Sequence, residues 1–269
     1  MPTATTTITK SSRIPKSFLP PLSSLSPQPM AAQQTSKTTA LNSLYNRAAR
    51  AFVLRDIALT YSLLQSGFAL LNPPTIIVPD SLSEHRRKWD ILRITFESTV
   101  YTSPPSSTES LPESLRTNLL ESPQALATSI YSRSLALFTP SNEGFSKTAS
   151  LNAAYLPYQV ISTLVYCTIK IDAPDVGRIV IEDWLARREP RYSLEHRSPE
   201  KPESGVGYEK TLELYTLHIL PKLEQWDYAK EFLEYESELT SQQREVKFFV
   251  LKKNIWSDIC FSNFVIFST

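Results

Sequence analysis

The side chains that could carry out catalysis or bind a metal are few and widely separated in this chain. The three histidines, His85, His196 and His218, lie in different segments, so we expect neither a metal site nor a catalytic triad from them. The adjacent acids Glu182 and Asp183 would point about 100° apart on a helix, which does not support paired-carboxylate catalysis. Motifs typical of nucleotide, serine-hydrolase and zinc-protease sites are absent from the sequence. We therefore expect neither an enzyme nor a bound cofactor.

The composition narrows the class of protein further. Cys167 and Cys260 are too few and too far apart for a disulfide framework or a zinc site, which suits a reducing compartment. A net charge of +1 argues against a nucleic-acid partner held by a basic surface. Hydrophobic residues make up 41% of the chain, which is enough for a buried core. Five glycines against 20 prolines favour helices separated by proline-containing breaks.

Charged residues near position 50 form the best candidate for a partner-binding site. Arg47 and Arg50 are three residues apart on the polar side of one expected helix, and Arg55-Asp56 stands at the turn after it. Guanidinium groups beside an exposed Phe52 or Leu54 would dock an acidic, partly apolar surface through bidentate pairs. The alternative interpretation is an ordinary solvated face. The candidate residues are Arg47, Arg50, Phe52, Arg55 and Asp56.

These residues belong to a helical hairpin that we expect between Leu41 and Pro74. Apolar residues recur with a period of 3.6, restart with a new phase after Leu54-Arg55-Asp56, and end at Asn72-Pro73-Pro74. The two apolar faces consist of Leu41, Leu44, Tyr45, Ala48 and Phe52, and of Ile57, Tyr61, Leu64, Phe68 and Leu71. Neither helix can bury its face alone, so the hairpin predicts further hairpins. Small residues at Ala48, Thr60 and Gly67 are similar to those of a tetratricopeptide repeat.

Two further helices are expected before residue 140. The first runs from Arg86 to Tyr101 and begins in a basic run, residues 85–88, that is either a docking patch or a solvated face. After a loop over residues 102–110, Ser122-Pro123 predicts a capped helix start, and that helix ends before Pro140. The inward residues expected are Trp89, Leu92, Phe96, Val100, Ala127, Ile130, Leu135 and Phe138.

The second half of the chain predicts a hairpin, a loop and a final helical unit. The hairpin spans Leu156 to Arg188 and splits at Asp172-Ala173-Pro174. Residues 189–206 are expected to be an exposed loop. The last unit, residues 208–253, has Leu212, Tyr215 and Ile219 on a first helix, a break at Pro221, and then one long helix or two short ones. The inward residues expected in the hairpin are Val160, Leu164, Cys167, Ile171, Val176, Ile179, Val180 and Trp184.

Three regions are thus expected along the chain. Residues 1–40 form a disordered Ser/Thr/Pro-rich tail, with an organelle transit peptide as the alternative. Residues 41–253 form a helical repeat-like domain, and residues 254–269 form a short apolar tail, which would be a truncated or altered anchor region. The predicted fold class is all-α, with antiparallel helical hairpins stacked as a tetratricopeptide-like or 14-3-3-like α-solenoid.

The order of these segments resembles the helical domain of the peroxin-26 family in its fungal form. The similarity covers roughly residues 41 to 253. It rests on Leu156-Pro157 before the third hairpin, on Ala173-Pro174 and Trp184-Leu185 within it, and on Leu220-Pro221 followed by a new helix. The resemblance implies a cytosol-facing adaptor at the peroxisomal membrane that recruits the pair of AAA ATPases by binding one of them. The ATPases then extract the import receptor, so that it is reused for protein import into the matrix.

Two features of this interpretation stay open. Family members are held by a carboxyl-terminal transmembrane anchor, whereas residues 254–269 are fewer than the roughly 20 residues needed to span a bilayer. A truncated or alternatively spliced product would explain this difference and would leave a cytosolic form. The alternative function is a generic tetratricopeptide-like or 14-3-3-like peptide-binding scaffold, for which a row of inward Arg and Lys side chains would be the discriminating feature.

Overall fold

A computed structural model describes residues 30–75, 80–109, 111–141, 151–188 and 202–266 of the chain. It confirms the all-α prediction, because these described residues form helices and connections and contain no strand. The α-helices are α1 Met30–Val53, α2 Ile57–Leu70, α3 Ser83–Thr102, α4 Glu113–Leu120, α5 Pro123–Phe138, α6 Tyr158–Lys170, α7 Pro174–Arg187, α8 Pro202–Leu214, α9 Leu220–Lys222, α10 Trp226–Tyr235 and α11 Ser241–Ile266. A 3₁₀ turn, Ala153–Tyr155, precedes α6, and a π-helix, Tyr215–Ile219, joins α8 to α9.

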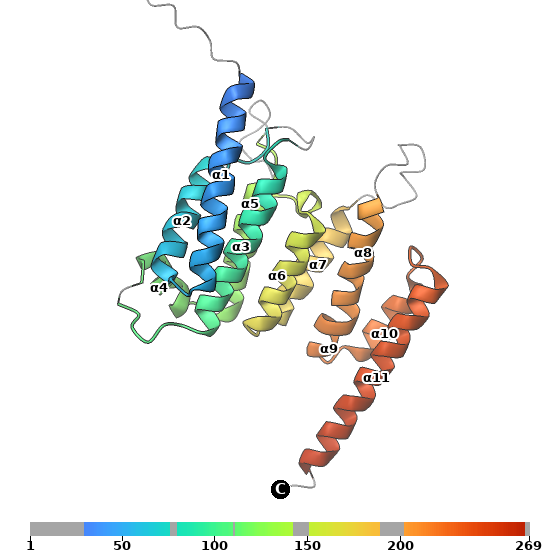
Figure 1. Cartoon of the computed structure of the whole chain (residues 1–269). Helices are drawn as coiled ribbons and strands as arrows, with labels where there is room; N and C mark the ends of the chain where they lie inside the picture. The colour runs from blue at the N-terminus through green and yellow to red at the C-terminus, as the bar shows by residue number, and fades with distance from the viewer. Residues whose placement is uncertain (1–29, 76–79, 110, 142–150, 189–201, 267–269) are drawn as a thin grey trace, which may run out of the picture.

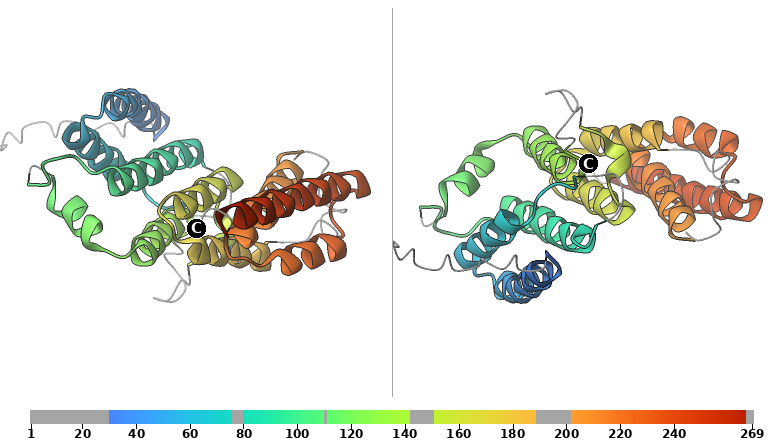
Figure 2. Two further views of the ribbon diagram at one scale, coloured as in Figure 1. Left: turned by 90° about the horizontal axis from the view of Figure 1, so that it is seen from below. Right: turned by 90° about the horizontal axis from the view of Figure 1, so that it is seen from above.

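Most of the helices lie side by side in one elongated row and run alternately in opposite directions (Figure 1). Helices α1, α2 and α3 gather at one end of the row, and α8, α10 and α11 gather at the other, as the views along the helices show (Figure 2). The two ends are connected through α6, which packs against α3 on one side and against α8 on the other. The buried apolar side chains of both ends therefore belong to one continuous core.

Three of the helical hairpins turn in the same way. In each turn, a residue other than glycine adopts a positive φ angle: Arg55 at 59°, Asp172 at 63° and Glu224 at 58°. The N–H of the next residue then bonds to the carbonyl five residues earlier, Asp56 to Ala51 at 3.0 Å, Ala173 to Thr168 at 2.8 Å and Gln225 to Leu220 at 2.9 Å. These bonds are those of a Schellman motif, which satisfies the last carbonyls of the first helix. The turn thus directs the second helix back along the first.

The same pattern of burial follows each of these turns. A small buried residue lies five positions after the positive-φ residue, and a large buried aliphatic residue lies nine positions after it. The small residues are Thr60, Gly177 and Ala229, and the large ones are Leu64, Ile181 and Leu233. At Gly177 an added β carbon would lie only 2.7 Å from Cδ1 of Ile219, so helices approach closely there. The hairpin is therefore a repeated structural unit of this chain.

Most of the expected inward faces are confirmed. Trp89, Leu92, Phe96 and Val100 of α3 are buried, and so are the four residues named for the helix before Pro140. Ser122 caps that helix, since its side chain accepts a hydrogen bond from the N–H of Ala125 and proline follows at the first helical position. Asp172-Ala173-Pro174 separates α6 from α7 as expected. After Pro221 the last unit contains two helices, the short α10 and the long α11, where one long helix or two short ones were expected.

The expected boundaries were wrong in four places, one of them residue 253, which α11 passes without a break. Helix α1 begins at Met30 instead of Leu41, because the first helix continues through Ser- and Thr-containing sequence that composition assigned to the tail. Helix α4 was not expected, and because it buries only Leu115 it shows little hydrophobic periodicity. Helix α8 begins at Pro202, within the segment expected to be a loop. Residues 1–29 and 189–201, with His196, lie outside the described residues.

Pro221 does not break the helix that precedes it. The chain passes from α8 through the π-helix into α9 and turns only at Glu224. A proline removes one backbone N–H, and its ring clashes with the carbonyl four residues earlier in a regular α-helix. The wider π-turn avoids this clash, and Leu220 donates to the carbonyl of Tyr215, five residues before it.

Two side chains point the opposite way from the prediction. Ile179 is 58% exposed, because α7 buries the neighbouring Val180 and Ile181 instead. Arg86, in the basic run before Trp89, is buried rather than part of a patch or a solvated face. Its Nε donates to the carbonyl of Asn72 at 2.8 Å, and its guanidinium pairs with Asp80. Arg86 therefore ties the start of α3 to the end of α2.

Candidate functional site

The predicted partner-binding residues do not form a single cluster. Arg47 and Arg50 are exposed on α1, as expected. Phe52 follows Arg50 by two residues, which is about 200° around a helix, so the two point in nearly opposite directions. Phe52 is half-buried and packs edge-on against Phe96 of α3, with ring centroids 6.1 Å apart. Of the two apolar residues expected to be exposed beside the arginines, Phe52 is therefore half-buried, whereas Leu54 is exposed.

Exposed apolar residues lie at the end of α1, and the expected Leu54 is one of them. Val53 is 78% exposed and Leu54 is 73% exposed. Leu54 is four residues after Arg50, which places the two on the same side of the helix end. The tip of the first hairpin thus combines two apolar side chains with the guanidinium of Arg50.

The turn residues Arg55 and Asp56 have different roles. The carboxylate of Asp56 caps α2 by accepting a hydrogen bond from the N–H of Leu59 at 3.0 Å. Its carbonyl also accepts from the hydroxyl of Thr60 at 2.6 Å. Asp56 is therefore a structural residue of the hairpin, whereas the side chain of Arg55 is exposed at the mouth of a pocket.

This pocket has a volume of about 270 Å³ and lies where the first hairpin meets the end of α3. Its apolar wall comes from α1, α2 and α3, and its outer wall comes from the loop that follows α3. The lining residues are Phe52, Arg55, Ile57, Thr60, Phe96, Thr99, Val100, Ser103, Pro104, Pro105 and Ser106. Two of the residues predicted from the sequence, Phe52 and Arg55, thus meet here.

The surroundings of the pocket are basic. Its lining contains Arg55 and no acidic side chain. Lys170 of α6 reaches the same place, because its Nζ donates to Oγ1 of Thr99 at 2.8 Å. Within the described part of the chain, none of Arg47, Arg50, Arg55 and Lys170 forms an ion pair. Four cations therefore lie in or near this end of the molecule without a carboxylate partner from the described residues.

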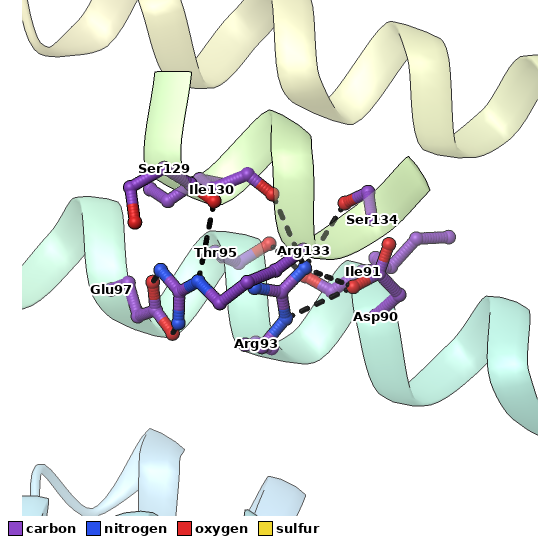
Figure 3. Close-up of polar contacts among 9 residues, drawn as sticks. All are labelled: Asp90, Ile91, Arg93, Thr95, Glu97, Ser129, Ile130, Arg133 and Ser134. Atoms are coloured by element: carbon purple, nitrogen blue, oxygen red, sulfur yellow. Dashed lines mark hydrogen bonds and ion pairs between the residues drawn. The ribbon is translucent and has the colours of Figure 1, made fainter. Parts of the chain in front are cut away.

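A buried polar network holds the α3 wall of the pocket against α5 (Figure 3). Asp90 is fully buried and pairs with Arg93, whose Nε donates to Oδ1 at 3.0 Å. Arg93 also donates to the hydroxyl of Ser134 on α5 at 3.0 Å. Next to this pair, Arg133 of α5 donates to Glu97 of α3 at 2.8 Å. The fully buried pair of Asp90 and Arg93 is sensitive to loss of either partner, and the half-exposed Arg133 adds a second link from α5 to α3, so together they fix the orientation of α3.

Sequence reasoning missed this network, although one signal was present. Asp90, Arg93 and Glu97 follow the spacing i, i+3 and i+7, which places them on one face of α3. They alternate with the apolar residues that carry the 3.6 period, and were not among the residues expected to face inward. Their shared face packs against α5, so the helix is buried on two sides.

The acids Glu182 and Asp183 diverge, as the sequence predicted. Glu182 accepts a hydrogen bond from the hydroxyl of Tyr215 at 2.6 Å, whereas Asp183 accepts one from Tyr131 at 2.6 Å. Burial, and then these hydrogen bonds, raise the pKa of both tyrosines above the ordinary range. The two carboxylates thus join α7 to different neighbours and do not face a common substrate.

A further polar cluster joins α8 to the segment between α10 and α11. Tyr208 donates to the carboxylate of Glu236 at 2.7 Å, and burial followed by this bond raises its pKa. Arg188 lies over the ring of Tyr208, 3.7 Å from its centroid, and pairs with Glu238. Each charged group in this cluster has a neighbouring partner, which is typical of a structural role.

Comparisons with known proteins assign no relative to this chain. No family model, no curated protein and no solved structure matches it. Among the described residues, no helix is both long enough and apolar enough to cross a lipid bilayer. The described residues also contain no group of three or more His, Cys, Asp or Glu side chains suited to a metal ion.

Proposed function

We propose that this protein is a helical adaptor that recruits a AAA ATPase at the cytosolic face of the peroxisomal membrane. The partner and the location follow from the resemblance of residues 41–253 to the fungal peroxin-26 family. On this proposal the recruited ATPase pair extracts the import receptor, and the adaptor itself carries out no chemistry. The repeated hairpin with its small buried residue supports a tetratricopeptide-like stacking of the helices.

The observation that carries the proposal is the tip of the first hairpin. Val53 and Leu54 are exposed there, next to arginines that have no ion pair within the described residues. Apolar side chains in water and unpaired guanidinium groups both gain from a partner that covers them, and arginine is enriched in protein interfaces. An acidic, partly apolar surface of the ATPase would satisfy both requirements.

The proposal is tested with the full chain and the purified pair of peroxisomal AAA ATPases. We expect the double substitution Arg47→Glu and Arg50→Glu to weaken binding at least tenfold, or about 1.4 kcal/mol. Both side chains are exposed, so the melting temperature should not change. A matched control is Arg116→Glu with Lys222→Glu, which changes the net charge equally at exposed positions elsewhere. Unaltered binding in the first variant, or equal losses in both, would contradict the proposed docking site.

The alternative peptide-binding scaffold is less well supported. A phosphopeptide groove of the 14-3-3 type needs inward cations that are free to meet the ligand. The buried cations among the described residues already have carboxylate partners: Arg86 pairs with Asp80, Arg93 with Asp90, and Lys247 with Glu209 and Glu213. We therefore favour docking at the exposed tip.

A further inference from the structure

We propose that the pocket between the first hairpin and the end of α3 binds one bulky apolar side chain from an acidic segment of the docked partner. This inference rests on the proposed adaptor function and specifies its contact. The occupant is a protein segment in which an aromatic or large aliphatic residue has Asp or Glu as its neighbours. Four features of the pocket lead to this occupant.

The size of the pocket favours a side chain over a small molecule. Its volume of about 270 Å³ is at the small end of the range of ligand and cofactor sites, which is roughly 300 to 1,000 Å³. Phe52, Phe96 and Val100 supply an apolar wall on which a ring or a branched side chain can pack. Phe52 and Phe96 already meet edge to face, and a third ring could continue that arrangement.

The positive charge around the pocket favours acidic residues on either side of the inserted side chain. Arg55 belongs to the lining, and Lys170 is held at the rim by its hydrogen bond to Thr99. The nearest acid in sequence, Asp56, is engaged in capping α2. A carboxylate on either side of the inserted residue would therefore meet a cation, whereas a lysine there would be repelled.

The conformation of Arg55 keeps it at the mouth of the pocket. Its positive φ angle of 59° is part of the Schellman turn, and hydrogen bonds from the N–H groups of Arg55 and Asp56 fix that turn. The cation is thus placed by the backbone of the hairpin and not only by a flexible side chain, which reduces the entropy lost when it binds an anion.

The opposite wall is also fixed before a partner arrives. Arg93, which is paired with Asp90, donates to Ser134 of α5, and Arg133 of α5 pairs with Glu97, so that α3 is joined to α5 at two points. Phe96, Thr99 and Val100 are therefore held in one orientation, and the pocket does not have to form on binding.

The test uses three short peptides and the full chain. The probes are acetyl-Glu-Phe-Glu-amide, acetyl-Lys-Phe-Lys-amide, which reverses the charge, and acetyl-Glu-Ala-Glu-amide, which lacks the ring. Binding is measured by titration, following the amide chemical shifts of Ser103 and Ser106. We expect only the first peptide to bind in the millimolar range and to shift these amides, with at least tenfold weaker binding of the other two.

Two kinds of variant measure separately what the apolar pocket and the cation of Arg55 contribute to peptide binding. Ser103→Trp and Ser106→Trp each place a ring over the pocket from an exposed loop position, and either should abolish binding. Arg55→Asn removes the cation but keeps a residue that tolerates a positive φ angle, and should weaken binding about three- to tenfold. Lys222→Asn is the matched control, because it removes an exposed cation elsewhere in the chain and should have no effect.

Equal binding of the three peptides, or binding that survives both tryptophan substitutions in folded protein, would overturn this inference. That result would leave the proposed function intact if the full chain still binds the ATPase pair through Arg47 and Arg50. Conversely, selective peptide binding without ATPase binding would remove the proposed partner and keep the pocket as a site for acidic apolar segments.

Discussion

Gly67 of α2 lies directly against the six-membered ring of Trp89 of α3, with no room for a methyl group between them. A β carbon added at Gly67 would be 2.7 Å from Cζ2 of the indole. Trp89 is fully buried, and Tyr45 of α1 packs edge-on against it with ring centroids 5.6 Å apart. The indole is enclosed by α1 and α2, so it cannot move aside without disturbing the packing of the first three helices.

We therefore predict that Gly67→Ala destabilises the protein, although alanine is the better helix former. Overpacking costs typically about 1 to 3 kcal/mol, which exceeds the roughly 1 kcal/mol that alanine contributes through helix propensity. The free energy of unfolding in urea should fall accordingly. Ser66→Ala, at the exposed neighbouring position, serves as control and should stay within about 0.5 kcal/mol. A more stable Gly67→Ala variant would show that the indole can shift.

The helices could be predicted from the sequence because their apolar residues carry the period. Trp89, Phe96 and Val100 mark the buried face of α3 in the sequence alone. The buried face of a helix was ambiguous where apolar residues are consecutive, as in residues 179–181. There the prediction placed Ile179 in the core, whereas its side chain is exposed.

The candidate site could be predicted only in part. Arg55 and Phe52 were identified from their types and their place at a turn. The pocket between them could not be predicted, because its outer wall is residues 103–106, which follow a helix some 50 residues later in the chain. Its volume depends on how the end of α3 meets the first hairpin, and local periodicity contains no information about that contact.

The buried pair of Asp90 and Arg93 gives a second prediction. Asp90→Ala should lower the free energy of unfolding by about 3 to 5 kcal/mol, since it leaves the guanidinium of Arg93 buried without its charge partner. Replacing both residues, with Asp90→Leu and Arg93→Met, should recover much of this loss because neither member of the pair is then left as an unpaired buried charge. Urea denaturation of the single and double variants measures both effects.

An exposed ion pair on the same helix provides the control. Glu84 pairs with Arg87 and Lys88 at the start of α3, where all three side chains are at least partly exposed. Glu84→Ala should cost no more than about 1 kcal/mol. If Asp90→Ala costs as little as this control, the pair contributes nothing to holding α3 against α5.

The buried thiol of Cys167 should make the folded protein less stable at alkaline pH. Burial, and then the nearby carboxylate of Glu97, raise the pKa of its thiol from 9.0 to about 11. Between pH 9 and about 11, the thiol of the unfolded chain loses its proton while the thiol of the folded protein keeps it. The stabilising contribution of the thiol is therefore complete below pH 9 and is lost as the pH rises to about 11. The slope from this group is at most about 1.4 kcal/mol per pH unit.

The measurement compares the wild-type protein with Cys167→Ala in urea between pH 8 and about pH 10.5, a window that begins below the lower pKa of 9.0 and covers most of the interval up to about 11. The alanine variant should be less stable at every pH because of the cavity, but its stability should fall less steeply above pH 9. Tyr131, Tyr208 and Tyr215 are present in both proteins, so they do not affect the difference. Parallel curves would mean that the thiol has the same pKa in the folded and unfolded states.

Trp184 and Ile179 of α7 form a matched pair for testing which face of this helix is buried. Trp184 is only 9% exposed and has Arg188 stacked over its ring at 5.9 Å, whereas Ile179 is 58% exposed. Trp184→Ala should therefore lower the free energy of unfolding by about 3 to 5 kcal/mol, because it removes a large buried ring and leaves a cavity. Ile179→Ala should change it by no more than about 0.5 kcal/mol, since alanine also favours helix. Comparable losses in the two variants would mean that a partner or a neighbouring segment covers Ile179 in solution.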